Sequence, residues 1–119
     1  MIPSGAVPFQ CSVSITNSAT AVQLADSLTA ADLAATAKRT YYVTQCTATS
    51  RDAAADTNVD LLSDTTRIWR QAVAQAGGGF SANGTQALCW TAEGGALKAK
   101  LADAIAGAVH LNVAGYWLP

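Results

Sequence analysis

Apolar and polar residues alternate strictly in two segments of this chain. In residues 11–16, Cys11, Val13 and Ile15 fall on one face, and the residues between them are serine or threonine. Residues 109–117 continue the same pattern, with valine or leucine at every second position from 109 to 113. A period of two is typical of a strand that is buried on one side. Both segments are therefore predicted to be strands.

Four further segments are predicted to be strands from their residue types and their boundaries. Residues 39–47 are dense in β-branched and aromatic side chains, which suit a pleated surface. The other three segments are 59–63, 67–75 and 86–91. Small polar residues and glycines separate them, and Asn83-Gly84 is a tight-turn signal. Residues 76–79, with three glycines, are expected to be a loop, because glycine loses much entropy when a strand orders it.

The secondary structure of two segments cannot be decided from the sequence pattern. In 96–104, Leu97, Ala99 and Leu101 alternate as in a strand, yet Leu97, Leu101 and Ile105 also have the spacing of a helix. Residues 28–37 are rich in alanine, and Thr29 is suited to cap a helix. We expect a short helix or an irregular crossing loop in this second segment.

Six or seven short strands with glycine-rich turns predict an all-β fold, an antiparallel sandwich or barrel. We expect a small, jelly-roll-like β-sandwich formed by residues 11–119 as a single domain. Its predicted core consists of Val13, Ile15, Val43, Leu61, Leu88, Leu97, Leu101, Leu111 and Val113. Residues 1–10 contain Pro3, Gly5 and Pro8 and are expected to be an extended N-terminal arm.

Composition narrows the classes of function. Charged residues make up 13% of the 119 residues, against about 25% in a typical soluble domain. Such a weakly polar surface is often buried against other subunits. The net charge is −1 and the seven basic residues form no run, so nucleic acid is not an expected partner. No stretch approaches the ~20 apolar residues of a membrane span, and residues 1–10 do not resemble a signal peptide. We therefore expect a soluble protein, made in a cytoplasm, with no membrane partner.

The cysteines do not predict a disulfide framework or a metal site. There are three, Cys11, Cys46 and Cys89, and no two of them form a CxxC pair. A zinc site would need all three to converge with His110, which no spacing supports. We expect buried, reduced cysteines that act as small apolar side chains, with no metal and no cofactor.

The other candidate groups do not predict catalysis. His110 is the single histidine and is expected on the outer face of an edge or interface strand, without an activated nucleophile beside it. Aspartates recur every four residues from Asp52 to Asp64, but a calcium loop of the EF-hand type needs ligands at every second position. Aromatic residues in strands usually belong to the core, and an exposed platform for sugar is the alternative. The aromatic residues concerned are Tyr41, Tyr42, Trp69, Trp90, Tyr116 and Trp117.

Four stretches together resemble small β-sandwich virion proteins of tailed bacteriophages, the capsid decoration (cement) proteins and related head or tail accessory proteins. The stretches are SVSITNSATAVQLADSLT, YYVTQCTA, TTRIWRQAVAQAGGGFSANGTQALCWTAEGGALKAKL and AVHLNVAGYW. They cover most of the chain in order, although 30–37 and 102–108 depart from the pattern. The resemblance favours a strand in 96–104, and it implies no catalytic residues.

The resemblance implies a non-enzymatic virion structural protein, most specifically a capsid decoration protein that stabilises the head. Its partners would be the major capsid protein or other virion proteins, and it would form a homo-oligomer, a trimer by analogy. Its location would be the virion, after synthesis in the bacterial host cytoplasm. The alternatives are a tail, baseplate or fibre-associated protein, or a carbohydrate-binding β-sandwich module.

The N-terminal arm is the expected contact with the shell. Residues 1–10 carry no charge, and Ile2, Val7 and Phe9 are apolar, unlike a free, solvated tail. Each such side chain contributes on the order of 1.5–3 kcal/mol when it is fully buried. The alternative is that the arm folds back onto its own sandwich.

Overall fold

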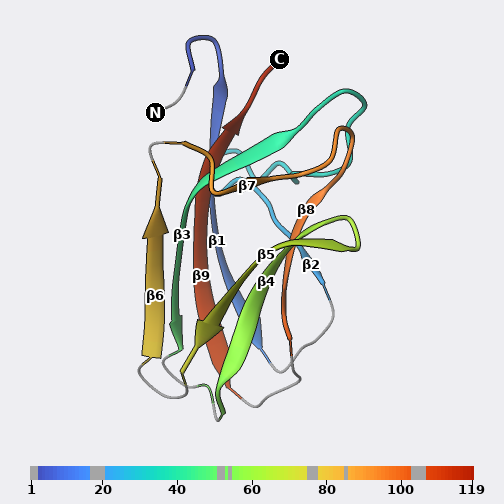
Figure 1. Cartoon of the computed structure of the whole chain (residues 1–119). Helices are drawn as coiled ribbons and strands as arrows, with labels where there is room; N and C mark the ends of the chain where they lie inside the picture. Colours follow the sequence, from blue (N-terminus) through green and yellow to red (C-terminus); the bar gives the residue numbers. More distant parts are fainter. Residues whose placement is uncertain are drawn as a thin grey trace.

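Two antiparallel sheets make up the fold, with no helix in the part of the chain that is described (Figure 1). A computed structural model describes residues 3–16, 21–50, 53, 55–74, 78–84, 86–102 and 107–119. Their strands are β1 (Val7–Thr16), β2 (Val22–Gln23), β3 (Tyr41–Ser50), β4 (Thr57–Ser63), β5 (Thr66–Val73), β6 (Gly78–Asn83), β7 (Cys89–Trp90), β8 (Leu97–Leu101) and β9 (Ala108–Trp117). The predicted all-β fold is confirmed.

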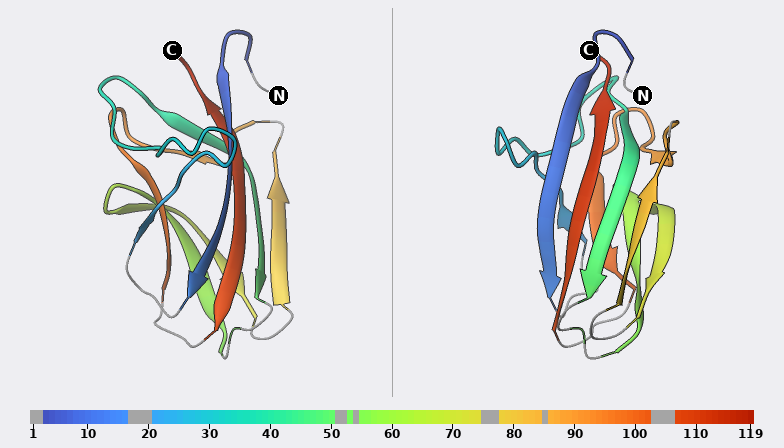
Figure 2. Two further views of the ribbon diagram at one scale, coloured as in Figure 1. Left: turned by 180° about the vertical axis from the view of Figure 1, so that it is seen from behind. Right: turned by 90° about the vertical axis from the view of Figure 1, so that its left-hand side faces the viewer.

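The strand order is that of a jelly roll. The first sheet, here called sheet A, has the order β1-β9-β3-β6, and the short β7 also pairs with β3. Sheet B has the order β2-β8-β4-β5. Setting β7 aside, the eight remaining strands of the described residues form two four-stranded layers, which is the jelly-roll arrangement. The two layers face each other (Figure 2). The chain crosses between the layers repeatedly, so residues far apart in sequence become neighbours on one face.

The alternation seen in the sequence decides which side chains enter the core. β1 and β9 pair in register over their whole length, from Val7 with Trp117 to Thr16 with Ala108. Of the nine predicted core residues, seven are buried, while Val13 and Leu88 are half-buried. Val13 still packs against the main apolar cluster. Of the two alternatives left open for 96–104, the structure has the strand that the resemblance favours, β8, whose leucines and Ala99 are buried.

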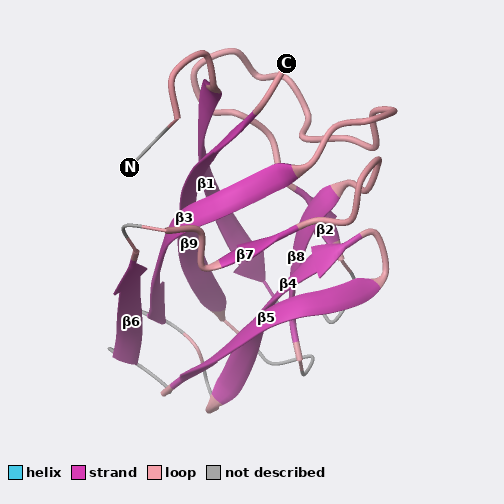
Figure 3. Cartoon of the chain, turned by 45° about the horizontal axis from the view of Figure 1, so that its top comes forward, coloured by secondary structure: helices cyan, strands magenta, loops and turns pink. Residues whose placement is uncertain are grey.

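No helix forms in residues 28–37, contrary to the helical alternative (Figure 3). Asp26 determines the local structure instead. Its carboxylate accepts hydrogen bonds from the Leu28 amide and the Thr29 hydroxyl, and its carbonyl accepts one from the Ala30 amide. Asp side chains compete in this way with helical hydrogen bonds, and Ala30 takes a left-handed φ of 60°. The segment is the crossing loop, held to the core by buried Leu33.

Two glycines that were expected in a loop belong to a strand. Gly78 and Gly79 begin β6 and pair with β3. A Cβ at Gly79 would lie 2.5 Å from the Ala48 carbonyl oxygen, so close backbone approach, rather than flexibility, explains this glycine. The strand predicted in 86–91 is shorter than expected and consists of Cys89–Trp90 alone.

The expected N-terminal arm is also shorter. Val7 to Gln10 are the first residues of β1 and pair with β9. They extend the alternation of 11–16 backwards, because Phe9 has the same parity as Cys11 and is buried. Pro8 does not stop the strand, since proline is tolerated at the edge of a sheet. Residues 3–6 precede β1, and residues 1 and 2 lie outside the described part of the chain.

Candidate interaction surface

Three aromatic side chains form a row across the outer face of sheet A. Tyr116 of β9 pairs with Tyr42 of β3, and Tyr42 pairs with Trp90 of β7. The two tyrosine rings stack at 5.0 Å with an interplanar angle of 16°. Trp90 lies 6.5 Å from Tyr42 at 41° and is 56% exposed. This row continues on the β1 side with Pro8, the partner of Tyr116.

The exposed large hydrophobic residues gather at the same end of the sandwich. In the described part of the chain they are Val7, Leu28, Trp90 and Leu118. Val7 begins β1, Leu118 follows β9, Trp90 is in β7, and Leu28 is in the crossing loop. The start of β1, the end of β9 and β7 lie in the upper half of Figure 1. We call these four residues, with Tyr42 and Tyr116, the apolar end. Within it, Val7 has the inward parity of Phe9 and lines a pocket with Arg39 and Trp117, so it does not share the outer face with the aromatic row. Exposed apolar residues that cluster, rather than scatter, mark interaction sites.

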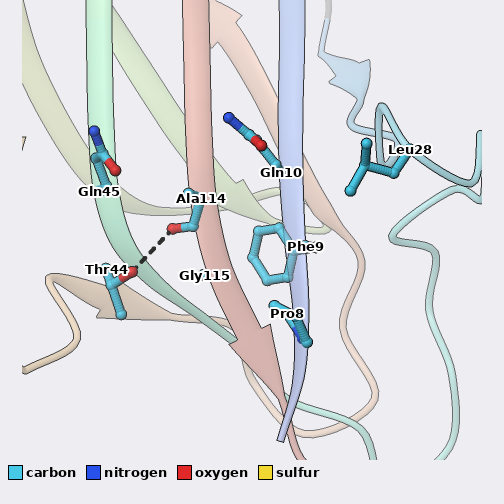
Figure 4. Close-up of a pocket in the computed structure, with 8 residues that line it drawn as sticks. All are labelled: Pro8, Phe9, Gln10, Leu28, Thr44, Gln45, Ala114 and Gly115. Atoms are coloured by element: carbon cyan, nitrogen blue, oxygen red, sulfur yellow. Dashed lines mark hydrogen bonds between the residues drawn. The ribbon is translucent and has the colours of Figure 1, made fainter. Parts of the chain in front are cut away.

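A shallow cavity of about 360 Å³ lies beside the aromatic row (Figure 4). It runs over β1, β9 and β3, and Leu28 from the crossing loop borders it. Gly115 lines it because no side chain fits there: a Cβ would overlap the Tyr42 carbonyl oxygen and lie 2.8 Å from Phe9 Cζ. Gln10, Gln45 and Thr44 give the cavity uncharged polar walls, and the Thr44 hydroxyl donates a hydrogen bond to the Ala114 carbonyl at 3.3 Å.

Charge is divided unequally between the two sheets. The strands of sheet A contain no Asp, Glu, Lys or Arg. The strands of sheet B carry Asp60, Arg67, Arg70, Lys98 and Lys100. Arg39, before β3, stacks its guanidinium over Trp117 at 3.6 Å. The strands of sheet A therefore present no fixed charge to a partner, and the nearest charges at the row of Tyr42 are Lys38 and Glu93, which line a pocket with Tyr42 and Leu118.

The structure describes two of the three predicted contact residues and places them differently. Val7 is 37% exposed and belongs to the apolar end. Phe9 is 4% exposed and packs edge-on against Tyr41 at 6.1 Å, so its side chain is part of the core. Ile2 lies outside the described residues.

Sequence reasoning assigned the aromatic residues to the core and so missed most of the apolar end. A signal was present for two of them. Tyr116 has the parity of His110 and Asn112, which face outwards, and adjacent Tyr41 and Tyr42 cannot both face inwards. Tyr41 is buried and Tyr42 half-buried, as this alternation requires.

His110 lies on the outer face of β9, as expected, although β9 is a central strand of sheet A. Its Nδ1 is 2.6 Å from the Ser14 hydroxyl, and both residues are exposed. No carboxylate orients the imidazole among the hydrogen bonds of the described residues, so the pair lacks the third group of a hydrolytic triad. Nor do three or more His, Cys, Asp or Glu side chains in that part of the chain come together to hold a metal.

The cysteines are free and buried. Burial raises the pKa of Cys11, Cys46 and Cys89 to about 12, with smaller contributions from Asp26 at Cys11 and from Cys89 at Cys46. Thiols with such a pKa are protonated at neutral pH and are poor nucleophiles and poor metal ligands. Their role is packing.

Comparisons with known proteins bear on the fold. No protein-family model and no curated protein matches the chain. Among solved structures, the chain is similar to a chain of the cyanophage Pam1 capsid asymmetric unit, with a TM-score of 0.50 and 23% identity over 100% of this chain and 90% of that one. A further match is the VLP of the giant freshwater prawn Macrobrachium rosenbergii extra small virus, with a TM-score of 0.41 and 13% identity over 100% and 83%. None of the described segments is a helix long and apolar enough to span a membrane. The chain thus has a fold that is also found in the capsid of a cyanophage.

Proposed function

We propose that this chain is a non-enzymatic structural protein of a bacteriophage virion, and specifically a capsid decoration protein that stabilises the head. The observation that carries the proposal is the jelly-roll fold shared over the full chain with a component of the Pam1 capsid asymmetric unit. Jelly rolls also occur in lectins, so the fold needs support from the surface. The protein would be made in the host cytoplasm and assembled onto the particle.

The apolar end is the surface that we propose contacts the shell. Trp and Tyr are the residues most often responsible for binding energy at protein interfaces, because they bury a large area at a low entropic cost. Trp90, Tyr42 and Tyr116 supply three of them in one row. Val7 stays a proposed contact, and so does Ile2 in the short segment before β1. Phe9 acts indirectly, by fixing the start of β1 to the core.

A tail, baseplate or fibre location is the second candidate within the same class, because the apolar end would suit any neighbouring virion subunit. A carbohydrate-binding module is less well supported. Sugars stack on open ring faces, whereas Tyr42 and Tyr116 cover each other's faces at 16°. Of this row, Trp90 is the exposed ring. A hydrolase is disfavoured because the Ser14–His110 pair lacks an orienting carboxylate among the described residues.

The proposal is tested with particles purified from the source of the chain. Density-gradient fractions are analysed by mass spectrometry for this chain and for the major shell protein, and heads are separated from tails. The proposal requires the chain in the head fraction, in a fixed ratio to the shell protein. Heads that lack it should open at a lower temperature. Recovery in tails alone would support the second candidate, and absence from every particle fraction would refute a virion role.

A further inference from the structure

Within the described residues, the two outer strands of sheet A each have an edge that is open over part of its length. In β1, the backbone groups of even-numbered residues point away from β9. This is evident at Gln10, whose carbonyl accepts a hydrogen bond from the Ser27 amide at 2.7 Å. Pro8 has no amide hydrogen to offer. Ser12 and Ser14 have the same parity as Gln10, and nothing in the described residues pairs with their outward backbone groups.

The opposite edge strand is β6, and its pairing with β3 determines which of its backbone groups point outwards. The Gly84 amide donates to the Thr44 carbonyl at 3.0 Å, which places the even-numbered residues of this strand towards β3. The backbone groups of Gly79, Ser81 and Asn83 therefore point outwards. No strand within the described part of the chain lies beyond them in sheet A.

Over residues 10–16 of β1 and over β6, the edges lack the features that normally prevent pairing. Natural edge strands are blocked by charged side chains, prolines or bulges. From Gln10 onwards β1 has none of these along its pairing with β9, and β6 pairs with β3 without a register shift. The side chains at the outward positions are small and uncharged, namely Ser12, Ser14, Gly79 and Ser81.

The two open stretches also lie at the same height on the sheet. Ser12 is in register with Asn112, Asn112 with Thr47, and Thr47 with Ser81. A second row runs from Ser14 through His110 and Thr49 to Gly79. Three antiparallel steps separate β1 from β6, so the two strands run in opposite directions, as a new antiparallel pair requires.

We propose that β1 of one copy pairs with β6 of a second copy, so that sheet A continues from one molecule into the next. With both copies at the same height, Ser12 pairs with Ser81 and Ser14 with Gly79. Strand direction, pleat and the direction of the backbone hydrogen bonds all agree in this register. The contact joins two different edges, so it is heterologous and closes into a ring or continues as a chain. It goes beyond the proposed function and needs no shell.

The test uses two proline variants of the isolated full-length protein. Ser12→Pro and Ser81→Pro each remove one outward amide and leave the pairing inside the sheet intact. Sedimentation velocity should show concentration-dependent oligomers of the unchanged protein and monomers of either variant. An equimolar mixture of the two variants should form a 1:1 dimer and nothing larger, because one intact β1 edge then meets one intact β6 edge.

Other outcomes overturn the proposal. Oligomers of Ser81→Pro alone would indicate β1–β1 pairing, and an unchanged protein that stays monomeric at its highest soluble concentration would exclude edge pairing. Circular dichroism checks the fold of each variant. Should a proline variant unfold, Ser12→Lys and Ser81→Lys place a charge at the same edges. Asn112→Lys is the matched control, since it adds that charge to the same row but in the central strand β9. Equal loss of association in the control would also refute the proposal.

Discussion

Replacing Trp90 with alanine should separate binding to the particle from folding. The residue is 56% exposed in the free chain. An aromatic side chain offers about 200 Å² for burial, so about 110 Å² of Trp90 is available to a partner. At about 25 cal/mol per Å², covering this area contributes close to 3 kcal/mol. Trp90→Ala should then weaken binding to the shell by about 100-fold.

The loss of folding stability in Trp90→Ala should not unfold the protein. The remaining, buried part of Trp90 contributes at most about 2 kcal/mol to stability by the same area estimate. A domain with a typical stability of about 5–15 kcal/mol stays folded after such a loss. Urea unfolding of the isolated variant measures this cost directly.

The binding assay is co-sedimentation of the labelled protein with heads that have been stripped of it. Gln71→Ala is the matched control, because Gln71 is exposed on β5 of sheet B, three residues beyond Ile68, which lines a pocket with Trp90. Its affinity should equal that of the unchanged protein. An affinity of Trp90→Ala within a few fold of the unchanged protein, or an equal loss in the control, would show that the apolar end is not the contact.

Three further changes test the packing of the fold by urea unfolding. Gly115→Ala should lower the free energy of unfolding by at least about 3 kcal/mol, because its Cβ would overlap the Tyr42 carbonyl. Ala114→Ser, at the neighbouring half-buried position, should lower it by under about 1 kcal/mol. Equal losses would contradict the close approach of the two backbones at Gly115. Arg70→Ala should cost about 2–3 kcal/mol and Asp60→Asn less. Asp60 is 1% exposed and would lose the guanidinium that contacts it at 2.7 Å, whereas Arg70 reaches water. The reverse order would refute this reasoning. Stability should fall as pH rises from about 9 towards 12, because the thiols of the unfolded chain ionise while burial keeps those of the folded protein protonated. The stability of Cys89→Ala should fall by about 1.4 kcal/mol less per pH unit than that of the unchanged protein. Parallel curves of stability against pH for the two proteins would exclude the Cys89 thiol as a cause.

The alternation of apolar and polar residues predicted the strands of this fold well wherever the two faces of a strand differ in polarity. β9 and most of β1 have apolar residues at every second position, and the structure buries these positions except Val13 and Trp117, which are half-buried. The spacing of apolar residues alone could not decide whether β8 would be a strand or a helix, since Leu97 and Leu101 suit both. Its neighbours decide the matter: β8 lies between β2 and β4, and its leucines enter the core between them.

The crossing loop and the apolar end could not be predicted in the same way. The side chain of Asp26 captures backbone groups of residues 28–30, a local hydrogen-bond competition that alanine content does not reveal. Trp90 lies in a strand of two residues, which is too short for any period to show its direction. Its place beside Tyr42 and Tyr116 depends on the strand order, in which β7 and β9 both pair with β3.

The strand order also decides whether the two proposed contacts can exist together. The edge pairing uses the rows of Ser12 and Ser14, whereas the aromatic row contains Pro8, Tyr116, Tyr42 and Trp90. The row of Gln10 lies between them, and there the Ser27 amide already occupies the edge of β1. Copies joined through their edges therefore keep every aromatic row open, all at the same end of the extended sheet. Linked copies bind a repeated surface more tightly than single ones without any new contact. A modest contact at each Trp90 is then sufficient to hold an oligomer on a shell, provided that the spacing of the linked rows matches the spacing of the shell subunits.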